Sequence, residues 1–248
     1  MDCPPQDRGH FIVAPQRRKA VLQEIKPICL ALPYKMGTVN CYLIKTDSGY
    51  LLIDTGGSNK RIELETELAN AGCKPGQLNL IVITHGDFDH TGNAAYLRQA
   101  FNTKIAMHRD DAGMAERGDM LSNRKKPNIL GKMMFALIPL LFGFGKSSRF
   151  TPDVFLQDGD DLSKHGFNAQ VLSLPGHSQG SIGILTAGGD LFCGDLLDNT
   201  ASPALSSMMD DPAAGNASID KLSGWKINTA YPGHGQPFPM EAFLKSKE

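Results

Sequence analysis

The sequence lacks the features of an exported, disulfide-stabilised protein. It has only five cysteines among 248 residues, and no two of them form a Cys-x-x-Cys pair. An odd number without such pairs argues against a disulfide framework and a zinc finger, and it favours a reducing compartment. The N-terminal stretch MDCPPQDRGHFIVAPQRRKA has no continuous apolar core of the kind found in secretory signals. We therefore expect a cytoplasmic protein.

The sequence also lacks an excess of either charge and a long hydrophobic run. Lysine and arginine number 25 against 26 for aspartate and glutamate, which gives a net charge of −1. Such a balance provides no overall field to attract nucleic acid. The most apolar segment, residues 128–146, is shorter than the ~20 residues that a membrane span requires, and it contains Lys132 and Pro139. We expect neither a nucleic-acid partner nor a transmembrane span.

Residues 1–23 combine prolines with mixed charges and predict a poorly ordered leader. Residues 24–248 have a different character, and we interpret them as a single domain. Short apolar runs rich in β-branched residues alternate with turn residues and helical segments, in two similar halves. This arrangement predicts an α+β protein in which helices cover a pair of stacked sheets.

Acidic and histidine side chains follow the predicted strands at their C-terminal ends. Because strand ends in a layered fold meet at one edge, we expect these groups to gather in one cleft. A cluster of carboxylates and imidazoles is costly unless a cation neutralises it, and this mixture suits zinc, iron or manganese. The candidate metal ligands are His85, Asp87, Asp89, His90, His177, Asp195 and His234.

The spacing of these residues resembles the metallo-β-lactamase superfamily. The motifs that carry the resemblance are His85-x-Asp87-x-Asp89-His90, Pro175-Gly176-His177-Ser178, Gly194-Asp195, Pro232-Gly233-His234-Gly235 and Ile53-Asp54-Thr55-Gly56. They occur in the family's order and span nearly the whole chain. The resemblance implies a four-layer αββα sandwich with a site for two divalent metal ions at the sheet edge, zinc first and iron or manganese as alternatives.

The resemblance also assigns roles to individual residues. It implies that His85 and His177 bind the first ion, that Asp89, His90 and His234 bind the second, and that Asp195 bridges the two. Asp54 would accept a hydrogen bond behind the ligands; the alternative is an aspartate that only caps a turn. Asp89 is the candidate catalytic residue, which would orient the nucleophilic water or take its proton.

Asp87 departs from the family pattern, which has histidine at this position. A carboxylate can also bind the first ion, because oxygen and nitrogen ligands have similar bond lengths. We expect the added negative charge to favour harder ions. Flavodiiron proteins resemble this variation, with glutamate and iron, although this chain is too short to contain their flavodoxin module.

The leading functional hypothesis is a metal-dependent hydrolase that cleaves an ester, thioester or lactone of a small molecule. The sequence LPGHSQGSIGI around His177 is similar to that of the glyoxalase-II-like and lactonase-like branches of the family. Two alternatives remain: a di-iron redox protein, and a metal-supported sensor that binds a small molecule without turnover.

An apolar helical insert is expected at about residues 119–149, around the segment 128–146. It has three interpretations: a lid over the cleft, a helix packed on the domain or in a homodimer contact, or a peripheral membrane contact. The last is suggested by the flanking basic residues Arg124, Lys125, Lys126, Lys146 and Arg149.

Overall fold

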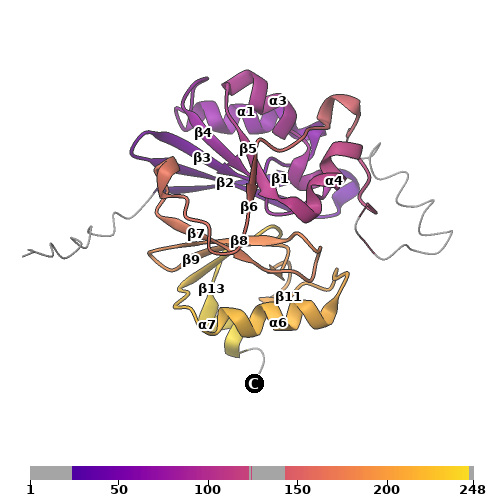
Figure 1. The fold of residues 1–248 in the computed structure, drawn as a ribbon, viewed down its shortest axis with the longest axis vertical. Helices are drawn as coiled ribbons and strands as arrows, with labels where there is room; N and C mark the ends of the chain where they lie inside the picture. Colours follow the sequence, from indigo (N-terminus) through magenta and orange to yellow (C-terminus); the bar gives the residue numbers. More distant parts are fainter. Residues whose placement is uncertain (1–23, 123, 125–142, 246–248) are drawn as a thin grey trace, which may run out of the picture.

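The computed structural model describes residues 24–122, 124 and 143–245. The predicted leader and most of the predicted insert therefore lie outside the described residues. Within these residues, two sheets stack face to face and helices cover the outer face of each (Figure 1). The α+β class and the four-layer αββα sandwich expected from the resemblance are confirmed.

The first sheet has six strands in the order of the chain, and its last four run parallel. They are β1 (Ile25–Ala31), β2 (Thr38–Thr46), β3 (Gly49–Ile53), β4 (Leu78–Val82), β5 (Ile105–His108) and β6 (Val154–Leu156). Its helices are α1 (Arg61–Asn70), α2 (Phe88–Thr91), α3 (Ala94–Phe101) and α4 (Arg109–Arg117). Short 3-10 turns lie at η1 (Pro33–Lys35), η2 (Ser58–Lys60) and η3 (Lys146–Ser148).

The second sheet has five strands in the order β13-β12-β9-β8-β7. They are β7 (Ala169–Ser173), β8 (Ile182–Thr186), β9 (Asp190–Gly194), β12 (Thr229–Pro232) and β13 (Phe238–Pro239). A small ribbon of β10 (Leu197–Asp198) and β11 (Ala204–Leu205) lies beside it, η4 (Ser163–His165) precedes β7, and the covering helices are α6 (Pro212–Leu222) and α7 (Met240–Lys245).

Alternating side chains along the strands build separate apolar layers. In β2, Tyr42 and Ile44 face the second sheet, where they pack with Phe192. Cys41 and Leu43 of the same strand face α1 and α3 instead. A third apolar cluster joins the second sheet to α6 and α7. The sheets are therefore buried on both faces, which explains their nearly continuous apolar sequences.

The two sheets are also joined by polar contacts next to the edge that carries the candidate site. Asn40 of β2 donates through Nδ2 to the carbonyls of Pro232 (3.0 Å) and Gly235 (2.6 Å). The hydroxyl of Tyr42 donates to the same Pro232 carbonyl at 2.5 Å. These bonds hold the loop after β12 against the first sheet.

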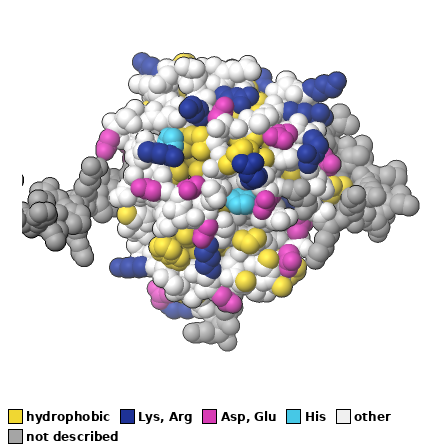
Figure 2. Space-filling model, viewed as in Figure 1, with side chains coloured by type: hydrophobic (Ala, Val, Ile, Leu, Met, Phe, Trp, Pro, Cys, Tyr) yellow, Lys and Arg dark blue, Asp and Glu magenta, His cyan; other side chains and the backbone are white. Residues whose placement is uncertain are grey.

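No helix among residues 24–122, 124 and 143–245 is both long and apolar enough to cross a bilayer. On the face shown in Figure 2, acidic and basic side chains are interspersed.

Candidate metal centre

The four predicted histidine ligands come together at one edge of the sandwich, and each turns its Nε2 atom inward. They follow β4, β7 and β12 or lie on α2, as the strand-end argument predicted. The other ring nitrogen, Nδ1, contacts an oxygen atom of the protein in each histidine. Nδ1 of His85 lies 3.0 Å from Oγ1 of Thr84, and Nδ1 of His90 lies 2.8 Å from Oδ2 of Asp54. Nδ1 of His177 lies 2.5 Å from the Met208 carbonyl, and Nδ1 of His234 lies 2.7 Å from the Thr38 carbonyl. Such contacts fix ring orientation in metal sites.

Three carboxylates complete the cluster, and Asp195 lies at its centre. The Oδ2 atom of Asp195 is 3.2 Å from the Nε2 of His234 and 3.7 Å from that of His85, while Oδ1 is 3.4 Å from the Nε2 of His90. The structure thus brings together all seven predicted ligands. Side-chain groups able to hold one ion are His85–Asp87–His177, His85–His90–Asp195 and Asp89–His90–His234.

Asp54 lies behind the cluster, as the sequence predicted. Its carboxylate accepts from the backbone N–H (2.8 Å) and hydroxyl (2.7 Å) of Thr84, and it lies 2.8 Å from the Nδ1 of His90. The backbone of Asp54 is left-handed, with φ 57°, a conformation in which aspartate and asparagine are enriched. A turn-capping role alone does not explain the contact with His90.

The cluster has atoms that require a further partner. Nε2 of His85, Nε2 of His90 and Oδ1 of Asp195 are buried and have no hydrogen-bond partner among the described residues. Unpaired buried polar atoms are costly, and imidazole nitrogens beside carboxylate oxygens are ligands for zinc or iron. The group made by Asp89, His90, His234 and Asp195 therefore fits a divalent ion.

The region around Asp87 is different, because an arginine that we did not predict lies against it. Nη1 of Arg124 is 2.9 Å from Oδ1 of Asp87, and its Nη2 lies 3.3 Å from Nε2 of His177, which is also 3.0 Å from Oδ2 of Asp87. Nε of Arg124 is 2.8 Å from Oδ2 of Asp210. With 7% of its side chain exposed, Arg124 does not form a basic flank that faces a membrane. The prediction that Arg124 contributes to a basic membrane-facing flank is therefore wrong.

Charges around the cluster shift its titration. Burial acts to raise the pKa of Asp87, but Arg124 and His177 hold that pKa well below its ordinary value. Burial together with the neighbouring His90 lowers the pKa of His85, so its ring is neutral at pH 7. A neutral ring keeps the lone pair that a metal ion requires.

Asp111 is a second residue missed by the sequence analysis. It is fully buried in the first turn of α4 and accepts hydrogen bonds from the Gly86 N–H (2.9 Å), the Ser178 hydroxyl (2.6 Å) and the Gly180 N–H (2.8 Å). It thereby ties the loop of Asp87 to the loop of His177. Asp111 lies just after β5, as the ligands lie just after their strands. The strand-end rule could therefore have identified it.

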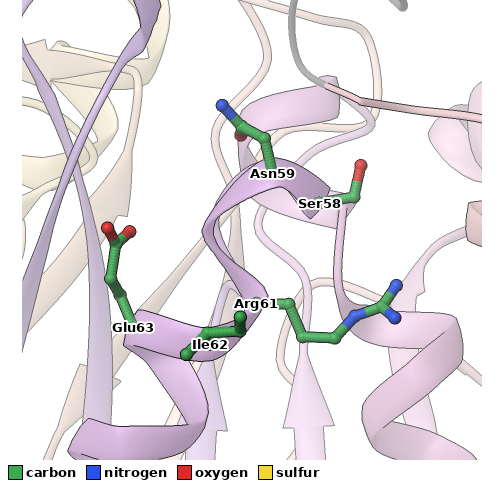
Figure 3. A pocket seen from close by; sticks show the side chains of 5 residues that line it. All are labelled: Ser58, Asn59, Arg61, Ile62 and Glu63. Atoms are coloured by element: carbon green, nitrogen blue, oxygen red, sulfur yellow. The ribbon is translucent and has the colours of Figure 1, made fainter.

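A hollow of about 480 Å³ lies away from these ligands, at the start of α1 (Figure 3). It is lined by Ser58, Asn59, Arg61, Ile62 and Glu63. The lining contains none of the predicted site residues, so we assign the chemistry to the cluster at the sheet edge.

Comparisons with known proteins agree with this geometry. Residues 34–234 match the family model of the metallo-beta-lactamase superfamily. The chain is 32% identical over 164 residues to the hydroxyacylglutathione hydrolase GloC of Haemophilus influenzae, an alignment that covers 64% of this chain and 66% of the relative, just under two thirds of its length. It is 25% identical to the acyl-coenzyme A thioesterase MBLAC2 of Bos taurus, with 86% of this chain and 78% of the relative covered.

Solved structures show the same fold. A metallo-beta-lactamase family protein of Thermus thermophilus, TTHA1429, superposes with a TM-score of 0.66 at 24% identity, over 90% of this chain and 78% of that one. TTHA1623 in a di-iron-bound form superposes with a TM-score of 0.64 at 26% identity, over 87% and 97%. With the match over residues 34–234, these findings show that the chain belongs to the metallo-beta-lactamase superfamily.

Proposed function

We propose that this protein is a metal-dependent hydrolase of small-molecule thioesters, with esters and lactones as weaker substrates. The observation that carries the proposal is the convergence of four imidazole Nε2 atoms and the carboxylates of Asp89 and Asp195 on one buried edge of the sandwich. The thioester class is supported by the relatives named as a hydroxyacylglutathione hydrolase and an acyl-coenzyme A thioesterase.

Asp89, His90, His234 and Asp195 would hold the ion, which we propose to be zinc. The neighbour in a di-iron-bound form supports iron as the second choice. A divalent ion in such a site supplies Lewis acidity and lowers the pKa of a bound water. Asp54 holds the ring of His90 from behind, and the Thr38 carbonyl does the same for His234.

Asp89 is the residue that we propose to act on the attacking water. Its side chain is 16% exposed and that of His234 is 21% exposed, whereas His85, His90 and His177 have 3% or less. A substrate would therefore approach from the side of Asp89 and His234. Burial raises the pKa of Asp89, which favours its action as a proton acceptor.

The test is a matched substrate panel with zinc-loaded and iron-loaded protein. An S-acyl glutathione, an acyl-coenzyme A, the corresponding oxygen ester and a lactone are compared by kcat/KM, with free thiol release as the signal for the thioesters and acid release for the others. We expect the thioesters to exceed the oxygen ester by at least about tenfold, and Asp89→Asn to lower kcat by about 10²–10⁴-fold. Asp47→Asn, on an exposed turn, is the control.

Metal-loaded protein without turnover of any of these substrates would contradict the hydrolase proposal. The sensor alternative would then be favoured if Asp89→Asn retained binding of the same compounds in calorimetry. Iron-loaded protein that changed oxidation state reversibly, with no hydrolysis, would favour the redox alternative.

A further inference from the structure

The guanidinium of Arg124 lies within one of the three groups that could hold an ion. Two members of that group, Asp87 and His177, are in direct contact with it, at 2.9 Å and 3.3 Å. Nδ1 of His177 lies 2.5 Å from the Met208 carbonyl, to which it must donate. Nε2 of His177 also lies 3.0 Å from Oδ2 of Asp87, so the guanidinium and this carboxylate together occupy the space in front of the ring nitrogen that an ion would need.

Arg124 is held in this position from its other side. Its Nε is 2.8 Å from Oδ2 of Asp210, and only 7% of its side chain is exposed. Arginine keeps its charge at every relevant pH. An ion between Asp87 and His177 would therefore face a fixed positive charge at close range.

The charge of the site explains why an arginine is accommodated here. Asp87 adds one negative charge at a position where the family pattern has a neutral histidine. Arg124 adds one positive charge in direct contact with it, at 2.9 Å. The pair leaves the net charge of the centre as it would be with histidine. The negative charge of Asp87 was the reason to expect a preference for harder ions. Because Arg124 neutralises that charge, we no longer expect this preference.

The remaining ligands have no such competitor. Among the described residues, Asp89 and Asp195 form ion pairs only with the histidine ligands, and neither carboxylate is paired with an arginine or a lysine. The contrast between the two halves of the cluster is the basis of the inference.

We propose that Arg124 replaces the first metal ion, so that this chain holds one tightly bound ion, at Asp89, His90, His234 and Asp195. The Arg124–Asp87 pair is then a permanent part of the centre, and Asp210 positions it. The inference rests on the metal centre of the proposed function, but not on hydrolysis.

The experiment measures ions per chain, independently of turnover. Metal-free protein is titrated with Zn²⁺ against a chromophoric chelator, and the bound ions are counted by elemental mass spectrometry after desalting. We expect one tight ion in the wild type and two in Arg124→Gln, with the second at least about tenfold tighter than any second ion in the wild type. Arg98→Gln, an arginine paired with Asp153 at 3.5 Å outside the cluster, should remain at one.

Asp210→Asn provides a second test if Arg124→Gln fails to fold. It removes the charge that holds Nε of Arg124, and we expect it to strengthen binding of a second ion. Two tight ions in the wild type would overturn the proposal. So would a stoichiometry that is the same in wild type, Arg124→Gln and Asp210→Asn. Failure of the hydrolase assay with a correct ion count would leave this inference standing and overturn only the proposed activity.

Discussion

Gly233 approaches the carboxylate of Asp195 so closely that a Cβ atom at position 233 would overlap its Oδ1, and the same Cβ would lie 2.8 Å from Cε1 of His90. Backbone of the loop after β12 thus packs directly against two candidate ligands that come from other elements. Only glycine permits this contact, because every other residue carries the Cβ.

Gly233→Ala is therefore expected to displace Asp195 or His90 and to weaken metal binding. A loss of about 10–100-fold in Zn²⁺ affinity is the expected scale for a disturbed ligand environment. Competition with a chelator measures it. Gly224→Ala, where the nearest atom to the new Cβ is 3.6 Å away, is the control. Equal affinities for the two variants would contradict the prediction.

Asp54→Asn tests whether the carboxylate behind His90 matters. Asparagine tolerates the left-handed backbone at this position, so the substitution mainly removes the charge that faces Nδ1 at 2.8 Å. We expect Zn²⁺ affinity to fall by about 10–100-fold. The urea midpoint, measured without metal, shows whether the fold itself has weakened. Unchanged affinity would mean that Asp54 only stabilises the turn.

Asp111→Ala should reduce stability more than most substitutions. It leaves the N–H groups of Gly86 and Gly180 and the Ser178 hydroxyl without their acceptor in a buried place. At roughly 1–3 kcal/mol for each buried unsatisfied group, with partial relaxation, we expect a loss of about 2–5 kcal/mol. Urea denaturation measures it. Asp110→Ala, with 42% of the side chain exposed, should cost less than about 1 kcal/mol.

Cysteine alkylation should follow burial. Burial raises the pKa of Cys73 to about 11, so about one thiol in a thousand is ionised at pH 8. The reactive thiolate forms only as pH rises, and the rate should increase about tenfold from pH 8 to 9. Peptide mapping after iodoacetamide treatment distinguishes Cys73 from the exposed Cys29. Modification of both at the same rate at pH 8 would contradict this prediction.

The sequence was sufficient to predict the layers and to bring the ligands together, because both depend on local patterns. Alternating apolar residues mark strands, and polar residues directly after parallel strands must meet at one edge. The start of α6, which extends from Pro212 to Leu222, is less clear from the sequence. Asp211 caps it and proline occupies its first turn, a known start signal, but alanine and glycine weaken the apolar periodicity of that turn.

Arg124 could not be predicted in the same way. It stands beside Lys125 and Lys126, and such a run usually faces solvent. Its burial depends on Asp87 and Asp210, 37 residues before it and 86 residues after it in the numbering. Only the folded chain brings these three side chains together, so no local pattern encodes the contact.

The hydrogen bonds from Asn40 and Tyr42 to the carbonyls of Pro232 and Gly235 join the loop after β12 to the first sheet. That loop carries His234, whose ring is held by the Thr38 carbonyl, 196 positions earlier. The ion site at His234 is therefore incomplete until nearly the last strand has docked onto nearly the first. An ion bound there would connect His90, beside the first sheet, to His234, beside the second. We expect the ion to be released when the two sheets separate.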